Sequence, residues 1–426
     1  MRRSPPPAVD DQQSGRAYRR DATTWRAFAA LFAFGVLNAM LGAVLPYLRE
    51  IEHVTYVTAA LHQVAFAVGG MAAGLLATRT TARRRRTIVA GLTGAASAGL
   101  LLGYGGVFPL TIIAALLVSA FATTALIRLW ALLADLHHVH RPVAMTEGEV
   151  AVSLAGIVTP AVVSACAATW VSWRFSFVIA FVLVIAAATA IATTRLPTPG
   201  RPPTNATPET AAAHSPRRTL VTIFAVVGLE FTLSFWAASY LHDDVGMPQT
   251  TAVAMISTLY AANLVGRLLV SRLTRKLTVT TTLHLSLATA LAGMPLLLTA
   301  TNAVTAGAGL AVTGIGIGGT FPLASSLHVA ASSRTADQAL GQTLTVAGIG
   351  QIVGPLAAGA LAQTTGLRLA LLVLPALTIL AALGARSTPH DPTNSVREPS
   401  APANPDGAPG TIGQGPDGTE RVIEPE

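Results

Sequence analysis

The stretch TLVTIFAVVGLEFTLSFWAASYL, residues 219–241, is apolar almost throughout. A helix rises 1.5 Å per residue, so about 20 residues cross a hydrocarbon core of roughly 30 Å. A single acid, Glu230, stands in the middle of the stretch. A charge costs about 2.5 to 3.5 kcal/mol at the centre of such a helix and therefore needs a reason. The stretch predicts a membrane-spanning helix that carries a functional carboxyl group.

Eleven further stretches have the same character. The chain has 426 residues, of which 52% are hydrophobic and 11% charged, and its mean hydropathy is +0.56. That is too little charge to coat a water-soluble protein of this size. We predict an all-α integral membrane protein with twelve transmembrane helices. The predicted helices are residues 26–48, 55–77, 87–107, 110–134, 149–170, 174–194, 219–241, 250–271, 279–300, 303–327, 339–362 and 368–386.

The basic residues fall on one side of these helices. If the N-terminus is cytoplasmic, the cytoplasmic side carries 24 of the 28 Lys and Arg residues, the other side carries three, and Arg128 lies inside the fourth helix. The positive-inside rule then predicts a multi-pass protein of the cell membrane with both termini in the cytoplasm. The same distribution explains the net charge of +8 without a nucleic-acid partner.

A polar segment divides the chain into two similar halves. The segment at 195–218 is rich in Pro, Thr and Ala and cannot span a membrane. Three landmarks recur 193 to 195 residues apart: Arg79 and Arg272, Trp173-Arg174 and Leu367-Arg368, Thr159-Pro160 and Gly354-Pro355. We predict a cytoplasmic tail at 1–25, a six-helix bundle at 26–194, a linker at 195–218, a second bundle at 219–386 and a disordered tail at 387–426.

Five motifs occur along the chain in a characteristic order. They are GLLATRTTARRRR at 74–86, SWRFSF at 172–177, RLLVSRLTRK at 267–276, GIGIGGTFP at 314–322 and GQIVGPLAAG at 350–359. Over residues 26–386 the chain therefore resembles the major facilitator superfamily. The resemblance implies two pseudo-symmetric six-helix bundles. It also implies a central cavity lined by the first, fourth, seventh and tenth helices, and transport by alternating access.

The repeats and the resemblance together give candidate gating residues. Arg79 and Arg272 follow corresponding helices in the two halves, while Pro160, Gly354 and Pro355 lie within corresponding helices. A proline inside a helix removes a backbone hydrogen bond and bends the helix. Matching bends in the fifth and eleventh helices suit symmetric gates.

Two charged residues lie within predicted cavity helices. Because the resemblance places the fourth and seventh helices on the cavity, we expect Arg128 and Glu230 to face each other. A carboxyl group that meets a cation in only one conformation can bind and release protons. Glu230 is thus the predicted proton site, and Arg128 is its partner or an anchor for an anionic substrate. Further polar residues that could line the cavity are Asn38, Trp236, Tyr240 and Asn263. Each is equally suited to a hydrogen bond between helices, and we take Asn38 and Trp236 as candidates for the cavity wall.

Other polar residues have structural explanations. Glu147 and Glu149 open the predicted fifth helix, where acids favour the helix dipole, so we expect capping there. Cys166 is the only cysteine, which excludes a disulfide framework and a Cys-based zinc site. The sequence has no GxxxxGK[ST] loop for a nucleotide. We expect no metal, no cofactor and no enzymatic activity.

These features favour a proton-coupled secondary transporter of a small organic solute, acting as a monomer in contact with membrane lipid. Mostly aliphatic cavity helices favour an antiporter that exports drugs or metabolites. The spacing of Glu230 and Trp236 is also similar to that in carriers related to sugar permeases, so an uptake permease is an alternative. The sequence determines neither the substrate nor the direction of transport.

Two hypotheses come from other classes. A polytopic lipid-handling membrane enzyme would need an interfacial catalytic cluster, and the adjacent Asp243 and Asp244 come nearest to one. A sensor or scaffold of the same fold is the other, because Thr78 and Ser271 stand where the resembled family usually has Asp.

Overall fold

The computed structural model describes residues 18–77, 84–137, 140–196, 215–332 and 336–386, and every regular element in these ranges is a helix. The C-terminal tail and most of the linker predicted at 195–218 lie outside them. The helices are α1 Ala22–Glu52, α2 Tyr56–Ala77, α3 Arg84–Tyr104, α4 Phe108–His137, α5 Arg141–Ala167, α6 Phe175–Ala192, α7 Pro216–Asp243, α8 Gln249–Leu273, α9 Val279–Leu298, α10 Ala303–Ile317, α11 Thr320–Ala331, α12 Ala336–Thr365, α13 Leu367–Ala370 and α14 Val373–Gly384.

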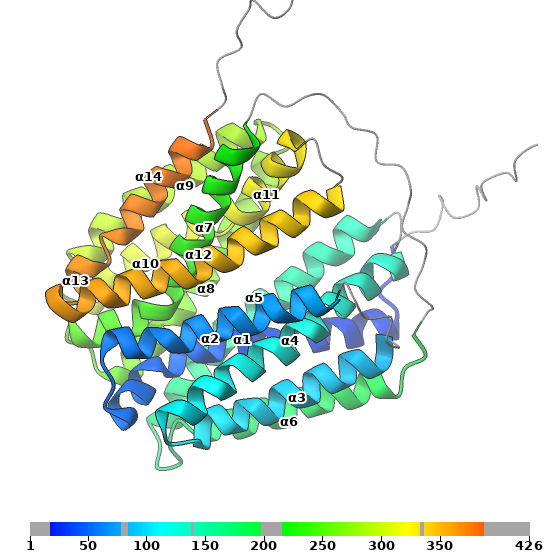
Figure 1. The fold of residues 1–426 in the computed structure, drawn as a ribbon, viewed down its shortest axis with the longest axis horizontal. Coiled ribbons are helices and arrows are strands. Elements are labelled where there is room, and N and C mark those ends of the chain that lie inside the picture. Colours follow the sequence, from blue (N-terminus) through cyan, green and yellow to red (C-terminus); the bar gives the residue numbers. More distant parts are fainter. Residues whose placement is uncertain (1–17, 78–83, 138–139, 197–214, 333–335, 387–426) are drawn as a thin grey trace, which may run out of the picture. The chain divides into compact units, whose positions relative to one another are not determined.

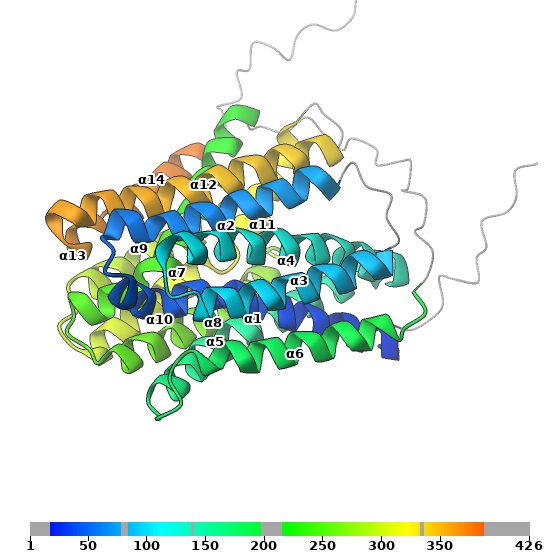
Figure 2. The ribbon, with the colours of Figure 1, turned by 60° about the horizontal axis from the view of Figure 1, so that its bottom comes forward.

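The helices form two bundles, α1–α6 and α7–α14 (Figures 1 and 2). The bundles meet where α5 packs on α8, α2 on α12 and α1 on α7. Within the described ranges twelve segments are long and apolar enough to cross a membrane, as predicted. The predicted fold class, an all-helical membrane protein of two bundles, is therefore confirmed.

Two of the predicted transmembrane helices are each built from two pieces. The segment predicted as one helix at 303–327 is α10 followed by α11, and the last segment is α13 followed by α14. The first break falls at Gly318 and Gly319, which pack tightly on α8: a Cβ on Gly318 would collide with the carbonyl oxygen of Asn263. A chain that approaches another backbone this closely needs glycine, and glycine weakens the helix at that point.

Helix α5 begins earlier than predicted. It starts at Arg141, with a proline in the first two positions, where proline is tolerated because its missing N–H has no helical partner. Glu147 and Glu149 therefore lie beyond the first turn, which contains no acid. The interpretation of these two residues as helix caps is wrong, and both form ion pairs instead.

Candidate functional site

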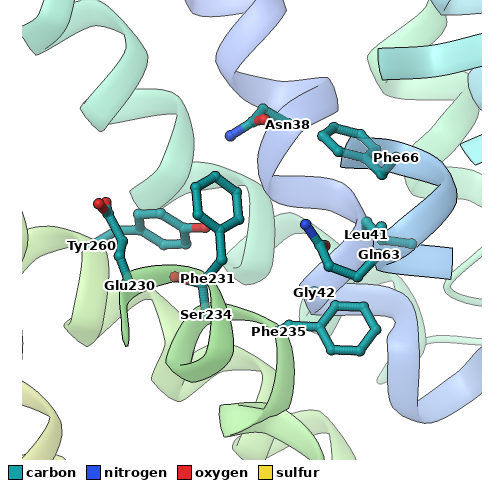
Figure 3. Close-up of a pocket in the computed structure, with 10 residues that line it drawn as sticks. All are labelled: Asn38, Leu41, Gly42, Gln63, Phe66, Glu230, Phe231, Ser234, Phe235 and Tyr260. Atoms are coloured by element: carbon teal, nitrogen blue, oxygen red, sulfur yellow. The ribbon is translucent and has the colours of Figure 1, made fainter. Parts of the chain in front are cut away.

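A small pocket with a cavity volume of about 60 Å³, open on one side, lies between the two bundles. Figure 3 shows residues of α1 and α2 facing residues of α7 and α8 across it. The lining residues are Asn38, Leu41 and Gly42 of α1, Gln63 and Phe66 of α2, Glu230, Phe231, Ser234 and Phe235 of α7, and Tyr260 of α8. Any motion of one bundle against the other changes this space.

The pocket combines aromatic rings with a few polar groups. Four of its ten lining residues are aromatic. On the α1–α2 side, Asn38 and Gln63 supply carboxamides, each of which can both donate and accept hydrogen bonds. The Gln63 side chain is buried, and its Nε2 has no hydrogen-bond partner in the described part of the chain. A donor left unpaired in a pocket is available to a ligand.

Glu230 of α7 supplies the carboxylate of the pocket, and a hydrogen bond from α8 fixes its position. Its Oε1 accepts a hydrogen bond from Asn263 Nδ2 at 3.2 Å, and the charges of Arg267 and Glu149 also act on it. Tyr260, Asn263 and Arg267 follow the i, i+3, i+7 spacing that places side chains on one face of a helix. One face of α8 therefore leads from the pocket to Arg267.

Arg267 connects this face of α8 to the other bundle. Its Nη1 lies 2.5 Å from Glu149 Oε2 on α5. The guanidinium thus forms an ion pair with Glu149 across the interface, and its charge also acts at longer range on Glu230 in its own bundle. Two backbone contacts continue the α5–α8 interface: Ser257 Oγ donates to Ile157 O at 2.7 Å, and Ser164 Oγ donates to Thr250 O at 2.8 Å.

A second polar contact joins the bundles where α1 and α7 end, and we call it the α1–α7 latch. Arg49 Nη1 lies 2.7 Å from Asp243 Oδ2, and the Tyr56 hydroxyl donates to the same oxygen at 2.8 Å. The Arg49 guanidinium also lies 4.0 Å from the centre of the Tyr56 ring. Between latch and pocket the backbones nearly touch, because a Cβ on Gly42 would lie 2.5 Å from Ser234 O.

Of the residues predicted to line the cavity or to pair with Glu230, some lie on the pocket and others do not. Asn38 lies on the pocket wall. Trp236 is not among the residues that line the pocket: it is fully buried, and its Nε1 donates to Pro355 O of α12 at 2.9 Å. Its ring meets the ring of Tyr56 of α2 edge to face at a centroid distance of 5.7 Å, so it packs at the interface between the bundles. Arg128 is a half-buried residue of α4 with interactions of its own. The groups that act on Glu230 are Asn263 and the charges named above, rather than Arg128.

The predicted gating residues are also dispersed. Pro160 is buried inside α5, and Pro355 is buried inside α12. Gly354 packs against α7, where a Cβ would lie 2.5 Å from Thr232 Oγ1. Arg272 is exposed in the last turn of α8, and Arg79 lies outside the described residues. Their part in gating stays a prediction.

Sequence reasoning missed several residues of the site. Gln63, Tyr260 and the role of Arg267 were not predicted. In the sequence, Arg267 looks like one of the basic residues that gather at the cytoplasmic ends of the helices. The helical spacing of Tyr260, Asn263 and Arg267 was a signal that could have linked them. For Gln63 the only signal was a polar residue within an apolar helix.

The acids proposed for an enzymatic site are engaged in other contacts. Asp243 belongs to the α1–α7 latch, and the Asp244 backbone carbonyl accepts a hydrogen bond from Arg368 at 3.0 Å. In the described ranges, no cluster of three or more His, Cys, Asp or Glu side chains could hold a metal ion. The structure gives Asp243 a role in joining the bundles.

Comparisons with known proteins agree with this architecture. A family model described as Major Facilitator Superfamily matches residues 27–347. No curated protein sequence matches the chain. The remaining similarities are to solved structures and rest on the arrangement of the helices.

Three of these structures illustrate the likeness. A bacterial homolog to the human lysosomal transporter Spinster, in an inward-facing and occupied conformation, has a TM-score of 0.71 and 14% identity over 87% of this chain and 98% of that chain. A D-xylose–proton symporter has a TM-score of 0.68 and 13% identity over 86% and 98% of the two chains. A single-residue mutant of the nucleoside transporter NupG has a TM-score of 0.68 and 12% identity over 86% and 99%. At these identities the likeness shows the fold alone.

Proposed function

This chain belongs to the Major Facilitator Superfamily, and we propose that it is a proton-coupled secondary transporter that moves a small organic solute by alternating access. One observation carries the proposal: the Glu230 carboxyl group lies on a pocket whose walls come from both bundles. A carboxylate within a membrane-spanning helix lowers the stability of the protein, so its presence indicates a function such as binding a proton or an ion. Its surroundings change when the bundles rock, which is the requirement for proton coupling.

Arg267 supplies the link between protonation and conformation in this proposal. With Glu230 ionised, the guanidinium is shared between Glu230 and Glu149. When Glu230 takes up a proton, its attraction for Arg267 disappears, and Arg267 is held by its ion pair with Glu149 of the first bundle alone. Proton binding in the pocket thereby changes an ion pair between the bundles. Arg128 keeps its second predicted role, as an anchor for an anionic group of the substrate.

The lining supports an amphipathic solute and slightly favours export. The rings of Phe66, Phe231 and Phe235 offer flat apolar surfaces, and few polar groups accompany them. An uptake permease for a sugar or another polar metabolite is the second candidate. The paired carboxamides of Asn38 and Gln63 favour it, because hydroxyl-rich solutes need groups that both donate and accept.

We place the protein in the cell membrane as a monomer with both termini in the cytoplasm. The distribution of basic residues supports this orientation. In that orientation the α1–α7 latch faces the outside, and Arg267 lies nearer the cytoplasm. The lipid-enzyme hypothesis loses its nearest candidate site, because Asp243 is paired with Arg49.

A solute screen in proteoliposomes, with and without an imposed pH gradient, tests the proposal. Lipophilic dyes and amines represent the first candidate, and sugars and nucleosides represent the second. Glu230→Gln should abolish gradient-driven flux and retain counterflow, since the substituted pocket keeps its shape and loses its proton site. Glu50→Gln, an exposed acid outside the pocket, is the matched control. Unchanged accumulation in Glu230→Gln would contradict proton coupling and favour the scaffold hypothesis.

A further inference from the structure

A second group of titratable side chains lies away from the pocket, inside the first bundle. Glu52 is the last residue of α1, His62 belongs to α2, and Thr111 belongs to α4. The side chains of Glu52 and His62 are each 1% exposed, and Thr111 is fully buried. The ring of Phe108 lies against His62 at a centroid distance of 5.4 Å. Burying a carboxyl group in such surroundings needs a compensating interaction.

Three short contacts connect these residues in a row. His62 Nδ1 lies 3.2 Å from Ala59 O, and His62 Nε2 lies 2.9 Å from Thr111 Oγ1. The Thr111 hydroxyl lies 2.6 Å from Glu52 Oε1. Glu52 Oε2 lies 3.6 Å from His62 Nε2 and has no hydrogen-bond partner in the described part of the chain.

Counting hydrogens along this row shows how many protons it holds. A neutral imidazole supplies one N–H, the threonine supplies one O–H, and an ionised carboxylate supplies none. Because the Ala59 carbonyl can only accept, three contacts would then share two hydrogens, and one contact would join two acceptors. One added proton gives each of the three contacts in the row its hydrogen. The Phe108 carbonyl, 3.0 Å from Thr111 Oγ1, is a further acceptor for the threonine hydroxyl outside the row, and it adds to the demand for hydrogens. A buried contact between two acceptors without a hydrogen is costly, so the geometry favours the protonated row.

We infer that Glu52, Thr111 and His62 form a proton-binding site, separate from the Glu230 pocket, that holds one proton in this conformation. The proton comes from water and has two equivalent positions. In one arrangement Glu52 is a neutral acid that donates to Thr111, which donates to His62 Nε2. In the other, His62 is doubly protonated and donates to Thr111, which donates to ionised Glu52. The threonine hydroxyl relays the proton between them without a net change in charge.

The charged neighbours are directed elsewhere. Arg49 pairs with Asp243, Glu50 faces Gln249, and His53 is exposed beyond the helix end. Among the described residues, the ion pair of Glu52 and His62 is the one that they form with each other.

Its position ties it to the α1–α7 latch. Glu52 lies three residues after Arg49, within the last turn of α1. Loss of the proton leaves one contact of the row without a hydrogen and loosens the attachment of this turn to α2 and α4. A proton bound here thus holds the end of the helix from which Arg49 reaches across to α7.

Two spectroscopic measurements on the full-length protein in lipid nanodiscs test the inference without any transported solute. The Glu230→Gln variant serves as the background, which removes the pocket carboxyl from the spectra. At pH 7, where an exposed carboxyl group is ionised, infrared spectroscopy reports a protonated carboxylic acid by its C=O stretch. Nitrogen-15 spectra of labelled histidine report whether the His62 ring carries one proton or two.

We expect a protonated-acid band that disappears in Glu52→Gln and persists in Glu50→Gln, or else a doubly protonated His62 ring. Either result supports the site, because the two describe the two positions of one proton. Thr111→Ser keeps the hydroxyl, so it should shift the signal and retain it, and this assigns the signal even if Glu52→Gln does not fold. An ionised Glu52 together with a singly protonated His62 would overturn the inference.

Discussion

The two bundles meet along two pairs of helices that the internal repeat of about 194 residues makes equivalent, and these pairs are held together differently. Along α5–α8, the Glu149–Arg267 ion pair is followed by two hydrogen bonds from serine to backbone carbonyls. Along α2–α12, no side-chain hydrogen bond joins the helices in the described ranges. Gly348 instead packs on the thioether of Met71.

The difference is largest at the level of the ion pair. With the 193-residue spacing of Arg79 and Arg272, the position equivalent to Arg267 is Gly74. With the 195-residue spacing of Pro160 and Pro355, the position equivalent to Glu149 is Leu344. A Cβ on Gly74 would meet no atom within 4 Å, and Leu344 is 62% exposed. At the level of the ion pair the bundles are therefore clamped along α5–α8, and the equivalent positions along α2–α12 do not meet. If the proposed alternating access is correct, the α5–α8 contact is its polar hinge, and the α2–α12 face opens more readily.

The largest effect should come from Arg267→Gln, which removes the cation that pairs with Glu149 and whose charge stabilises ionised Glu230. Removing one partner of a buried charge costs about 3 kcal/mol at the lower end of the usual range, or roughly a hundredfold. We expect gradient-driven flux to fall by about this factor in proteoliposomes. Arg275→Gln, on the exposed turn after α8, is the control. Equal rates for both variants would mean that the clamp has no role in coupling.

The α1–α7 latch offers the next test, because it closes the end of the interface beyond the pocket. Arg49→Gln removes a charged hydrogen bond, which is worth about 1.5 to 3 kcal/mol. We expect alkylation of Cys166, the only cysteine, by an impermeant maleimide to accelerate about tenfold. Arg174→Gln is the control, since Arg174 Nε binds Gly103 O within the first bundle. If the latch holds the bundles together, alkylation is faster in Arg49→Gln and unchanged in Arg174→Gln. Equal rates in both variants would contradict this role.

Steric packing gives a smaller contrast within α12. Gly354→Ala brings a methyl group against Thr232 and the backbone of Gly228 in α7, where the carbonyl oxygen of Gly228 would lie 2.7 Å away. Overpacking of this kind costs about 1 kcal/mol or more, so the thermal unfolding midpoint should fall. Gly348→Ala meets only the flexible side chain of Met71 and should leave the midpoint nearly unchanged. The reverse order would show that α2–α12 is the tighter face.

The smallest effect is expected from Glu149→Gln. Its side chain is 46% exposed, and exposed ion pairs contribute about 0 to 1 kcal/mol. We therefore expect less than about a fivefold loss of flux, far less than for Arg267→Gln, because Arg267 still compensates Glu230. Flux measured at several salt concentrations checks the origin of any loss, since screening weakens the wild-type pair. A loss as large as that of Arg267→Gln would place the essential interaction at α5.

Much of the fold was readable from the sequence, because a bilayer selects apolar helices by length. The twelve spans were found on this basis. The division of the tenth span was missed because Gly318 breaks the helix through its contact with Asn263, which no local pattern records. The early start of α5 was missed because Glu147 and Glu149 looked like its first turn, whereas each has an ionic partner outside the helix.

The site was only partly predictable for a related reason. A lone acid in an apolar helix is conspicuous, so Glu230 was found. Its neighbours depend on the packing of α7 on α8, and Arg267 had appeared to be one of several positive charges near a helix end. Trp236 looked suitable for a cavity because it follows Glu230 on α7, but its indole N–H donates to Pro355 O and its ring packs on Tyr56 between the bundles. The sequence thus finds an isolated charge more readily than its partners.

The close approach at Gly42 has a further consequence for how leakage is prevented. Here the backbones of α1 and α7 touch beside the pocket, with no side chain between them. If the bundles tilt about this contact, one opening can widen only as the other narrows. A bulky residue in place of Gly42 would act as a wedge, separating the bundles at both ends together. Such a protein would let solute run down its gradient through a continuous pore, and under the proposed mechanism solute flux would no longer depend on the proton gradient.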